Sequence, residues 1–341
     1  MRDNASNTFT TDGESGGPSQ LTRQERFVAL ADEFVVAPFR IMWDDLRARI
    51  GLFLLGLFVL MGTVGVLVVE VPHPNEGPAY VKPFVNPEFI LGTGKTGQDI
   101  FAQIVHSTPA MFQMILAGAL FSTVMGTTVG TVSGYVGGWV DTVLSTITDI
   151  VVTIPGLPLI IVLGALINPE NPYVVGVLLT ANVWAGVARA IRSQVLTLRH
   201  AEYVEASQAM GLSTRYSIFS DILPNIMPYV TVKFANSARF VIYSSVGLYF
   251  LGVLPFSTQN WGVMMNLAYN TGGIYLGIGL HWLFFPMLAI VLLILAFIFV
   301  AQGLDRVFNP RARARHVDKV PGDDEKSGGD GSSGPQVMEE F

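Results

Sequence analysis

The sequence has 341 residues, of which 50% are hydrophobic and only 13% are charged. Because an ordinary soluble domain carries roughly 25% charged residues, this composition argues against a soluble protein. The net charge is −6, and much of the acidity follows Arg315, which argues against nucleic acid as a partner. The absence of cysteine excludes disulfides, thiolate metal sites and a cysteine nucleophile.

The first 49 residues precede any long apolar run. Residues 1–23 are polar and lack the basic and apolar sequence of a cleavable signal peptide, so we expect a disordered cytoplasmic tail. Residues 24–49 place apolar side chains on one side and charges on the other, which predicts an amphipathic helix along the membrane surface. At the other end of the chain, residues 312–341 are predicted to form a disordered acidic cytoplasmic tail.

Residues 50–110 are predicted to hold the first membrane crossing and an external loop. The crossing, Ile50–Val69, contains no charged residue. A helix needs roughly 20 mostly apolar residues to cross the hydrocarbon core of a membrane, and this run has that length. The repeated prolines between Val71 and Pro87 are incompatible with a helix and therefore indicate the loop.

Residues 111–311 are predicted to form the transmembrane core. Long stretches without Asp, Glu, Lys or Arg recur here, and each is long enough for a crossing. With the first crossing they predict an all-α integral membrane protein of six transmembrane helices: Ile50–Val69, Met111–Val140, Val143–Ile167, Tyr173–Ala190, Pro228–Leu254 and Trp282–Leu304. Small residues near fourfold spacing in the second crossing predict a close packing face, and Pro155 and Pro158 predict a kink in the third.

The distribution of basic residues predicts the orientation. Arginines gather before Ile50, from Arg189 to Arg215 and after Leu304, whereas the proposed outer segments hold only Lys82 and Lys95. Because basic residues near membrane ends stay on the cytoplasmic side, both termini and the segment after Arg189 are predicted to be cytoplasmic. We therefore expect a multi-pass protein of the cell membrane.

The polar insertion between the fourth and fifth crossings predicts two short helices outside the membrane. Glu202–Met210 has a helical composition, and Gly211 supplies a turn that tolerates a positive φ. Ser213 or Thr214 can cap a second helix, and Pro224 is expected to stop it.

Residues in this insertion resemble the Glu-Ala-Ala motif of binding-protein-dependent ABC importer permeases. The matching pieces are Glu205-Ala206-Ser207, then Gly211, then Ile222-Leu223-Pro224-Asn225. Further pieces resemble the oligopeptide, dipeptide and nickel branch of that family: Gly92-Thr93 with Gly97-Gln98-Asp99, Gly134 to Asp141, Phe250-Leu251-Gly252, Trp261-Gly262 and Asn309-Pro310-Arg311.

The sequence also departs from the family pattern. Ser207 stands for the second Ala of the motif and Asp221 for its first Ile, and both changes fit a variable branch. In the outer loop, Gly94 and Gln98 replace the usual Asp and Arg, which weakens any inference about docking of a binding protein there.

The resemblance implies a non-catalytic subunit that forms half of a translocation path. It implies as partners a homologous second permease, two ABC ATPase subunits, an extracellular solute-binding protein and membrane lipid. ATP and Mg would be used by the ATPase subunits, and we expect this chain to bind no cofactor itself. The cargo implied is short peptides, with nickel complexes and oligosaccharides as alternatives.

The resemblance further implies coupling helices at residues 202–217 that dock in a groove of the ATPase. Small residues would let the partner approach, and charges would set the register. The residues assigned to ATPase coupling are Glu202, Glu205, Ala206, Ser207, Ala209, Gly211, Arg215, Leu223 and Pro224.

Charged residues lie inside predicted crossings or at their ends, and Lys233 and Arg239 both fall within the fifth. Arg239, within the fifth crossing, either lines the translocation path or extends toward the inner membrane surface. Asp141 and Asp149 are predicted to pair with arginines rather than to relay protons.

The residues do not support a phosphate-binding loop or an enzyme active site. Gly92 to Thr96 resembles a phosphate-binding loop only in part, because the first glycine of that motif would have to be Phe89. The five histidines are dispersed without metal-ligand spacing. A self-sufficient secondary transporter or channel, or a membrane scaffold or receptor, remains the alternative, although neither accounts for the spacing of Glu205, Gly211 and Pro224.

Overall fold

A computed structural model describes residues 42–255, 260–272, 275 and 277–308 of the chain. Within these ranges every regular element is a helix, and the only β-type pairing is an isolated bridge between Thr93 and Asp99. The expected tails at 1–23 and 312–341, and most of the expected helix at 24–49, lie outside the described residues.

The elements are α3 (Leu46–Leu60), η2 (Met61–Gly65), α4 (Val66–Val68), α5 (Ile100–Val136), α6 (Gly138–Thr153), α7 (Gly156–Ile167), α8 (Pro172–Leu179), α9 (Val183–Leu198), α10 (Glu202–Ala209), α11 (Thr214–Tyr216), η3 (Ser217–Ile222), α12 (Leu223–Phe250), α13 (Trp261–Asn270) and α14 (Leu280–Phe308).

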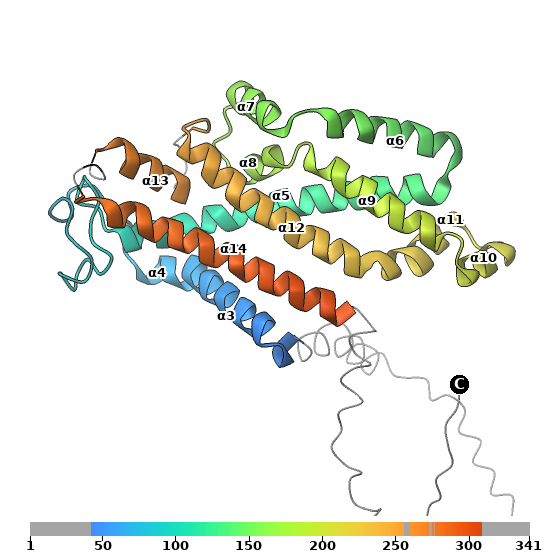
Figure 1. Cartoon of the computed structure of the whole chain (residues 1–341), viewed down its shortest axis with the longest axis horizontal. Coiled ribbons are helices and arrows are strands. Elements are labelled where there is room, and N and C mark those ends of the chain that lie inside the picture. The colour runs from blue at the N-terminus through green and yellow to red at the C-terminus, as the bar shows by residue number, and fades with distance from the viewer. Residues whose placement is uncertain (1–41, 256–259, 273–274, 276, 309–341) are drawn as a thin grey trace, which may run out of the picture.

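The helices run back and forth between two ends of an elongated bundle (Figure 1). The non-helical segment 69–99 and α13 lie at one end, and α10 and α11 form the opposite tip. The start of α3 and the end of α14 point toward the end that carries α10. The described parts of the three segments predicted to be cytoplasmic thus lie toward one end of the molecule.

The apolar helices fit a membrane protein, but only some are long and apolar enough to cross a bilayer alone. Among the described residues three helices qualify: Leu46–Val68, Ile100–Val136 and Leu280–Val307. Two bent pairs, α6 with α7 and α8 with α9, raise the count to five if each pair is one crossing. α12 has 28 residues but is less apolar because it contains Lys233, Asn236 and Arg239. The count of six crossings therefore stays a prediction.

Two helices begin earlier than the predicted crossings. α3 starts at Leu46 rather than at Ile50, because the Asp45 side chain accepts a hydrogen bond from the Arg47 N–H and caps the helix. Residues 46–49 are therefore continuous with the helix of the predicted first crossing. α5 starts at Ile100 rather than near Met111, since Asp99 accepts hydrogen bonds from the N–H groups of Phe101 and Ala102.

The predicted third crossing is broken rather than kinked. α6 ends at Thr153, and α7 begins after Pro155 at an angle of 85°. Pro155 has no N–H to donate to the preceding turn, which favours a break at this point. The position of the predicted bend is confirmed.

The predicted fourth crossing, Tyr173–Ala190, is also divided. α8 and α9 meet at an angle of 55°, and α9 continues to Leu198. The polar insertion therefore begins after Leu198 rather than at Arg189. The charged residues Arg189 and Arg192 remain inside a helix because their guanidinium groups pair with acidic side chains of α6.

Glycines of α5 form the predicted packing face. A Cβ atom at Gly126 would lie 2.6 Å from the Cβ of Val187, and one at Gly130 would lie 2.5 Å from the Ala188 carbonyl oxygen. A Cβ atom at Gly134 would lie 2.9 Å from the Cβ of Val195. These glycines, four residues apart, let α5 approach α9 at backbone distance.

This packing predicts that Gly130→Ala destabilises the protein. The new methyl group would collide with the Ala188 carbonyl, and overpacking of this kind costs about 1–3 kcal/mol. Thermal unfolding of the detergent-purified protein should show a lower Tm than that of the native chain. Gly56→Ala in α3 is the matched control, because a Cβ there meets no atom within 4 Å and alanine favours a helix. Equal Tm values for the two variants would contradict the assignment of this face.

Candidate functional site

The first short helix of the loop, α10, is anchored by its inward face. Val204 is fully buried in a cluster with Val195 of α9, Ile222 and Ile226. Ser207 is also buried and accepts the Leu212 N–H at its carbonyl oxygen. Glu202 and Glu205 lie in the first turn, where acidic side chains favour the positive end of the helix dipole.

Gly211 reverses the chain after α10. Its φ is +75°, a conformation that costs other residues roughly 1–2 kcal/mol. Its N–H donates to the Gln208 carbonyl at 3.0 Å, and the Leu212 N–H donates to the Ser207 carbonyl at 3.2 Å. This pair of bonds is the Schellman arrangement of a helix end. The turn predicted at Gly211 is confirmed.

The second helix does not stop at Pro224. The Ser213 side chain accepts the Tyr216 N–H at 3.3 Å, so Ser213, of the two candidates, is the cap. α11 then passes through the π-helical segment η3 directly into α12, and Pro224 occupies the first turn of α12. The tip of the loop is therefore continuous with a 28-residue helix.

Polar contacts join the loop to the end of α5. The Gln208 side-chain amide donates to the Tyr135 hydroxyl at 3.3 Å. The Arg199 guanidinium lies against Gly137, at 2.9 Å from the position that a Cβ would take there. The base of the loop therefore contacts the turn between α5 and α6.

Ion pairs hold α6 on α9 above this base. Arg192 donates from Nε and Nη2 to the two carboxylate oxygens of Asp141, both at 2.6 Å, and Asp141 also accepts from the Ser133 hydroxyl. Arg189 Nη2 donates to Asp149 at 2.6 Å. The predicted pairing of Asp141 and Asp149 with arginines is confirmed.

Most residues assigned to coupling lie on the outside of the loop. The exposed ones are Glu202, Glu205, Ala206, Ala209, Gly211, Arg215 and Pro224, whereas Ser207 is buried and Leu223 is partly buried. Large apolar side chains that the sequence reasoning did not single out share this exposure: Tyr203, Met210, Leu212, Tyr216 and Phe219. We call these exposed coupling and apolar residues the loop-tip surface. Large apolar residues in a segment predicted to face water were the signal that could have identified them.

Two of these apolar side chains are unusually exposed. Met210 is 70% exposed and Phe219 is 67% exposed in the isolated chain. Large apolar groups at the end of a polar loop are unfavourable in water and are typical of the centre of a protein interface.

Arg239 is partly exposed and lines a cavity that is open to the surface of the isolated chain. The cavity has a volume of about 490 Å³ and lies between α9, α12 and Ile294 of α14. The Arg239 guanidinium donates to the Asn236 side chain, and Lys233 Nζ lies 4.9 Å from the centre of the Tyr229 ring. Lys233 and Asn236 line the same cavity.

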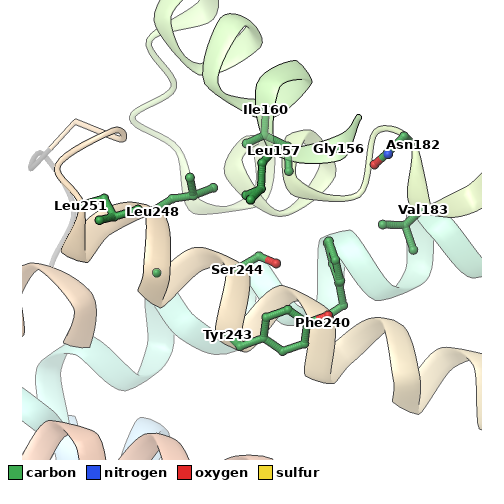
Figure 2. A pocket seen from close by; sticks show the side chains of 11 residues that line it. Gly156, Leu157, Ile160, Asn182, Val183, Phe240, Tyr243, Ser244, Leu248 and Leu251 are labelled. Carbon is green, nitrogen blue, oxygen red and sulfur yellow. The ribbon is translucent and has the colours of Figure 1, made fainter. Parts of the chain in front are cut away.

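A second, larger cavity continues along α12 (Figure 2). It has a volume of about 590 Å³ and lies between α7, the break that separates α8 from α9, and the second half of α12. Val183, Phe240 and Tyr243 line both cavities, so one surface of α12 borders them in succession. Hydropathy does not predict this cavity, although Pro155, which separates α6 from α7, lies next to one of its walls.

The outer-loop residues form a compact structure at the opposite end. Thr93 is fully buried; its hydroxyl donates to the Pro78 carbonyl at 2.6 Å and accepts the Val81 N–H at 3.0 Å. Gly94 packs on Trp282, where a Cβ would lie 2.9 Å from the ring. A larger side chain in place of Gly94 would collide with that ring, which gives a physical reason for the departure from the family pattern at this position.

The part of the chain that the structure describes contains no group of three His, Asp or Glu side chains that could hold a metal ion.

Comparisons with known proteins agree with these features. The profile of a family described as binding-protein-dependent transport system inner membrane component matches residues 126–314. The dipeptide transport system permease protein DppC of Bacillus subtilis is 30% identical over 273 residues, which cover 78% of this chain and 82% of that protein. The oligopeptide transport system permease protein OppC of the same organism is 27% identical over 282 residues, 80% of this chain and 90% of that protein. OppC of Lactococcus lactis subsp. lactis is 29% identical over 280 residues, 80% of this chain and 92% of that protein.

The two ion pairs predict unequal effects of removing one carboxylate. The Asp141 and Arg192 side chains are 19% and 33% exposed, whereas those of Asp149 and Arg189 are 63% and 55% exposed. Asp141→Asn should lower the free energy of unfolding by about 1.5–3 kcal/mol, because bonds between charged groups are lost from a sheltered site. Asp149→Asn, the matched control, should cost less than about 1 kcal/mol. Unfolding in increasing sodium dodecyl sulfate measures both, and a larger effect of Asp149→Asn would contradict the role of Asp141.

Proposed function

Because this chain belongs to the binding-protein-dependent transport system inner membrane component family, the permease subunits of ABC importers, we propose that its loop-tip surface docks on an ATP-hydrolysing subunit. Permeases of this kind are transport components and not catalysts. The docking would couple ATP hydrolysis by the partner to the passage of short peptides along the surface of α12.

The loop-tip surface is the observation that carries the proposal. It presents Met210 and Phe219 to the outside, with Glu205 and Arg215 beside them in the same loop. Apolar anchors within a charged rim are the usual arrangement of a protein interface. Lipid is a poor alternative occupant, because the loop lies at the tip of the bundle and carries exposed charges (Figure 1).

Coupling would follow from the way in which the loop is connected. α10 is anchored through Val204, and α11 continues through η3 into α12. A displacement of the loop would therefore move α12 as a rigid element instead of being absorbed by a flexible linker. Since α12 borders both cavities, its movement would change which end of the path is open.

The complete importer would contain further subunits. A homologous second permease would supply the other half of the path, two ABC ATPase subunits would bind ATP and Mg, and an extracellular solute-binding protein would deliver cargo. The chain would lie in the cell membrane with both termini and the loop-tip surface in the cytoplasm, as the arginine distribution predicts. The segment 69–99 and α13 would then face outward.

Arg239 and the cavities beside it would form this chain's half of the path. Short peptides are the proposed cargo, because the relatives named above are dipeptide and oligopeptide permeases. A self-sufficient transporter or channel would use the same cavities but would leave the exposed apolar residues of the loop without a role.

Replacement of Gly211 by Arg tests the docking. The variant strains a φ of +75° and adds bulk where no atom lies within 4 Å, so it should alter the loop-tip surface without disturbing the bundle. The ATPase recovered with the tagged chain from mild detergent should fall by about tenfold, a loss of roughly 1.4 kcal/mol in binding. Mass spectrometry of the purified complex measures this loss.

Gly277→Arg is the matched control, since Gly277 has a φ of +71°, equally open surroundings and a place at the opposite end. This variant should retain the ATPase. Equal retention by both variants would show that docking does not use the loop-tip surface. A native chain that copurifies with no ATPase, under conditions that preserve known complexes, would instead favour unaided transport.

A further inference from the structure

Two cations of α12 line one cavity without a carboxylate. Lys233 and Arg239 both border the 490 Å³ cavity, and its lining residues include no Asp or Glu. Along α12, Lys233 lies on the order of 15 Å and Arg239 on the order of 24 Å from the start of the helix, at a rise of about 1.5 Å per residue. Cations on a helix that crosses a membrane are unfavourable unless they meet water, protein or a counter-ion.

Three acidic side chains of the bundle pair with other arginines. Asp141 pairs with Arg192, Asp149 with Arg189, and Asp45 with Arg306. Among the described residues, neither Lys233 nor Arg239 takes part in an ion pair. The cavity therefore carries two positive charges that no described carboxylate balances.

Both cations contact uncharged groups, and one donor of Arg239 has no described partner. Arg239 donates to the Asn236 side-chain oxygen, and Lys233 lies over the Tyr229 ring. The Nε atom of Arg239 is buried and has no hydrogen-bond partner among the described residues. The guanidinium group thus retains donor capacity, and guanidinium is the side-chain group best matched to a carboxylate.

We propose that Arg239, supported by Lys233, binds the carboxylate of the cargo during its passage, so that this chain selects peptides with a free C-terminus. The proposal rests on the function proposed above and names the chemical group that its path recognises. Asn236 would act as a positioning residue, because its side-chain oxygen holds the Arg239 guanidinium.

The adjoining cavity matches the rest of such a cargo. Figure 2 shows Leu157, Ile160, Leu248 and Leu251 around a largely apolar space next to Phe240 and Tyr243. Phe240 and Tyr243 border the cationic cavity as well. A peptide whose carboxylate meets Arg239 would therefore have an apolar space for its side chains next to it.

Uptake by the complete importer in proteoliposomes tests the selection. The two probes are radiolabelled trialanine and its C-terminal amide, which differ only in the carboxylate. The ratio of their ATP-dependent uptake rates is compared between native and variant complexes, so that any preference of the binding protein cancels. Size-exclusion chromatography and ATPase activity report assembly of each complex.

Arg239→Gln should lower the ratio of acid to amide uptake by about tenfold, as expected for loss of a charge-assisted hydrogen bond. Lys233→Gln should lower the ratio less, and Arg239→Lys should keep part of the preference because its charge remains. Arg47→Gln removes an exposed cation of α3 outside the cavity and should leave the ratio unchanged.

An unchanged ratio in an Arg239→Gln importer that still transports both peptides would overturn the inference and leave the proposed function intact. Equal loss of both uptakes, together with loss of the second permease from the complex, would also overturn it, because Arg239 would then pair with an acid of that subunit. Absence of ATP-dependent uptake of either peptide by the native importer would refute the peptide cargo itself.

Discussion

The close contact between α5 and α9 is the constraint on which the rest of the bundle depends. Membrane helices gain little from the hydrophobic effect against lipid tails, so their association needs close van der Waals contact. Gly126, Gly130 and Gly134 provide it by bringing the backbone of α5 against α9. α9 leads directly into the loop, and the loop contacts Tyr135 in the last turn of α5 and Gly137 just after it. The packing in the bundle thereby fixes the position of the loop outside it.

The breaks in the helices create the space for a cavity beside α12. A straight, closely packed bundle would leave no space beside α12. Because Pro155 ends α6 and the chain bends again before Val183, α7 and the start of α9 stand apart from α12 and enclose a cavity. The backbone groups freed at such breaks need polar partners, and the Asn182 side-chain amide reaches the Ile154 carbonyl at 3.4 Å. α9 can therefore pack closely on α5 although the chain is bent just before α9 begins.

Continuity of the backbone gives the loop its mechanical connection. A glycine turn alone would uncouple the two short helices from the membrane, but α11, η3 and α12 follow one another without an intervening coil. Pro224 was expected to end the second helix and instead stands at the junction where η3 passes into α12. The same residue type therefore lies at a break between helices at Pro155 and at a continuous junction at Pro224.

The sequence by itself determined the all-helical membrane character, the glycine packing face, the turn at Gly211 and the pairing of Asp141 and Asp149 with arginines. These features follow from charge-free length, residue spacing and local backbone preference. Only the tertiary structure decided the capped starts of α3 and α5, the two broken helices, the burial of Ser207 and the cavity shared by Lys233 and Arg239. Caps and breaks depend on single hydrogen bonds that override a hydropathy pattern. Which side chains of α12 border a cavity is decided only when α7, α9 and α14 pack around that helix.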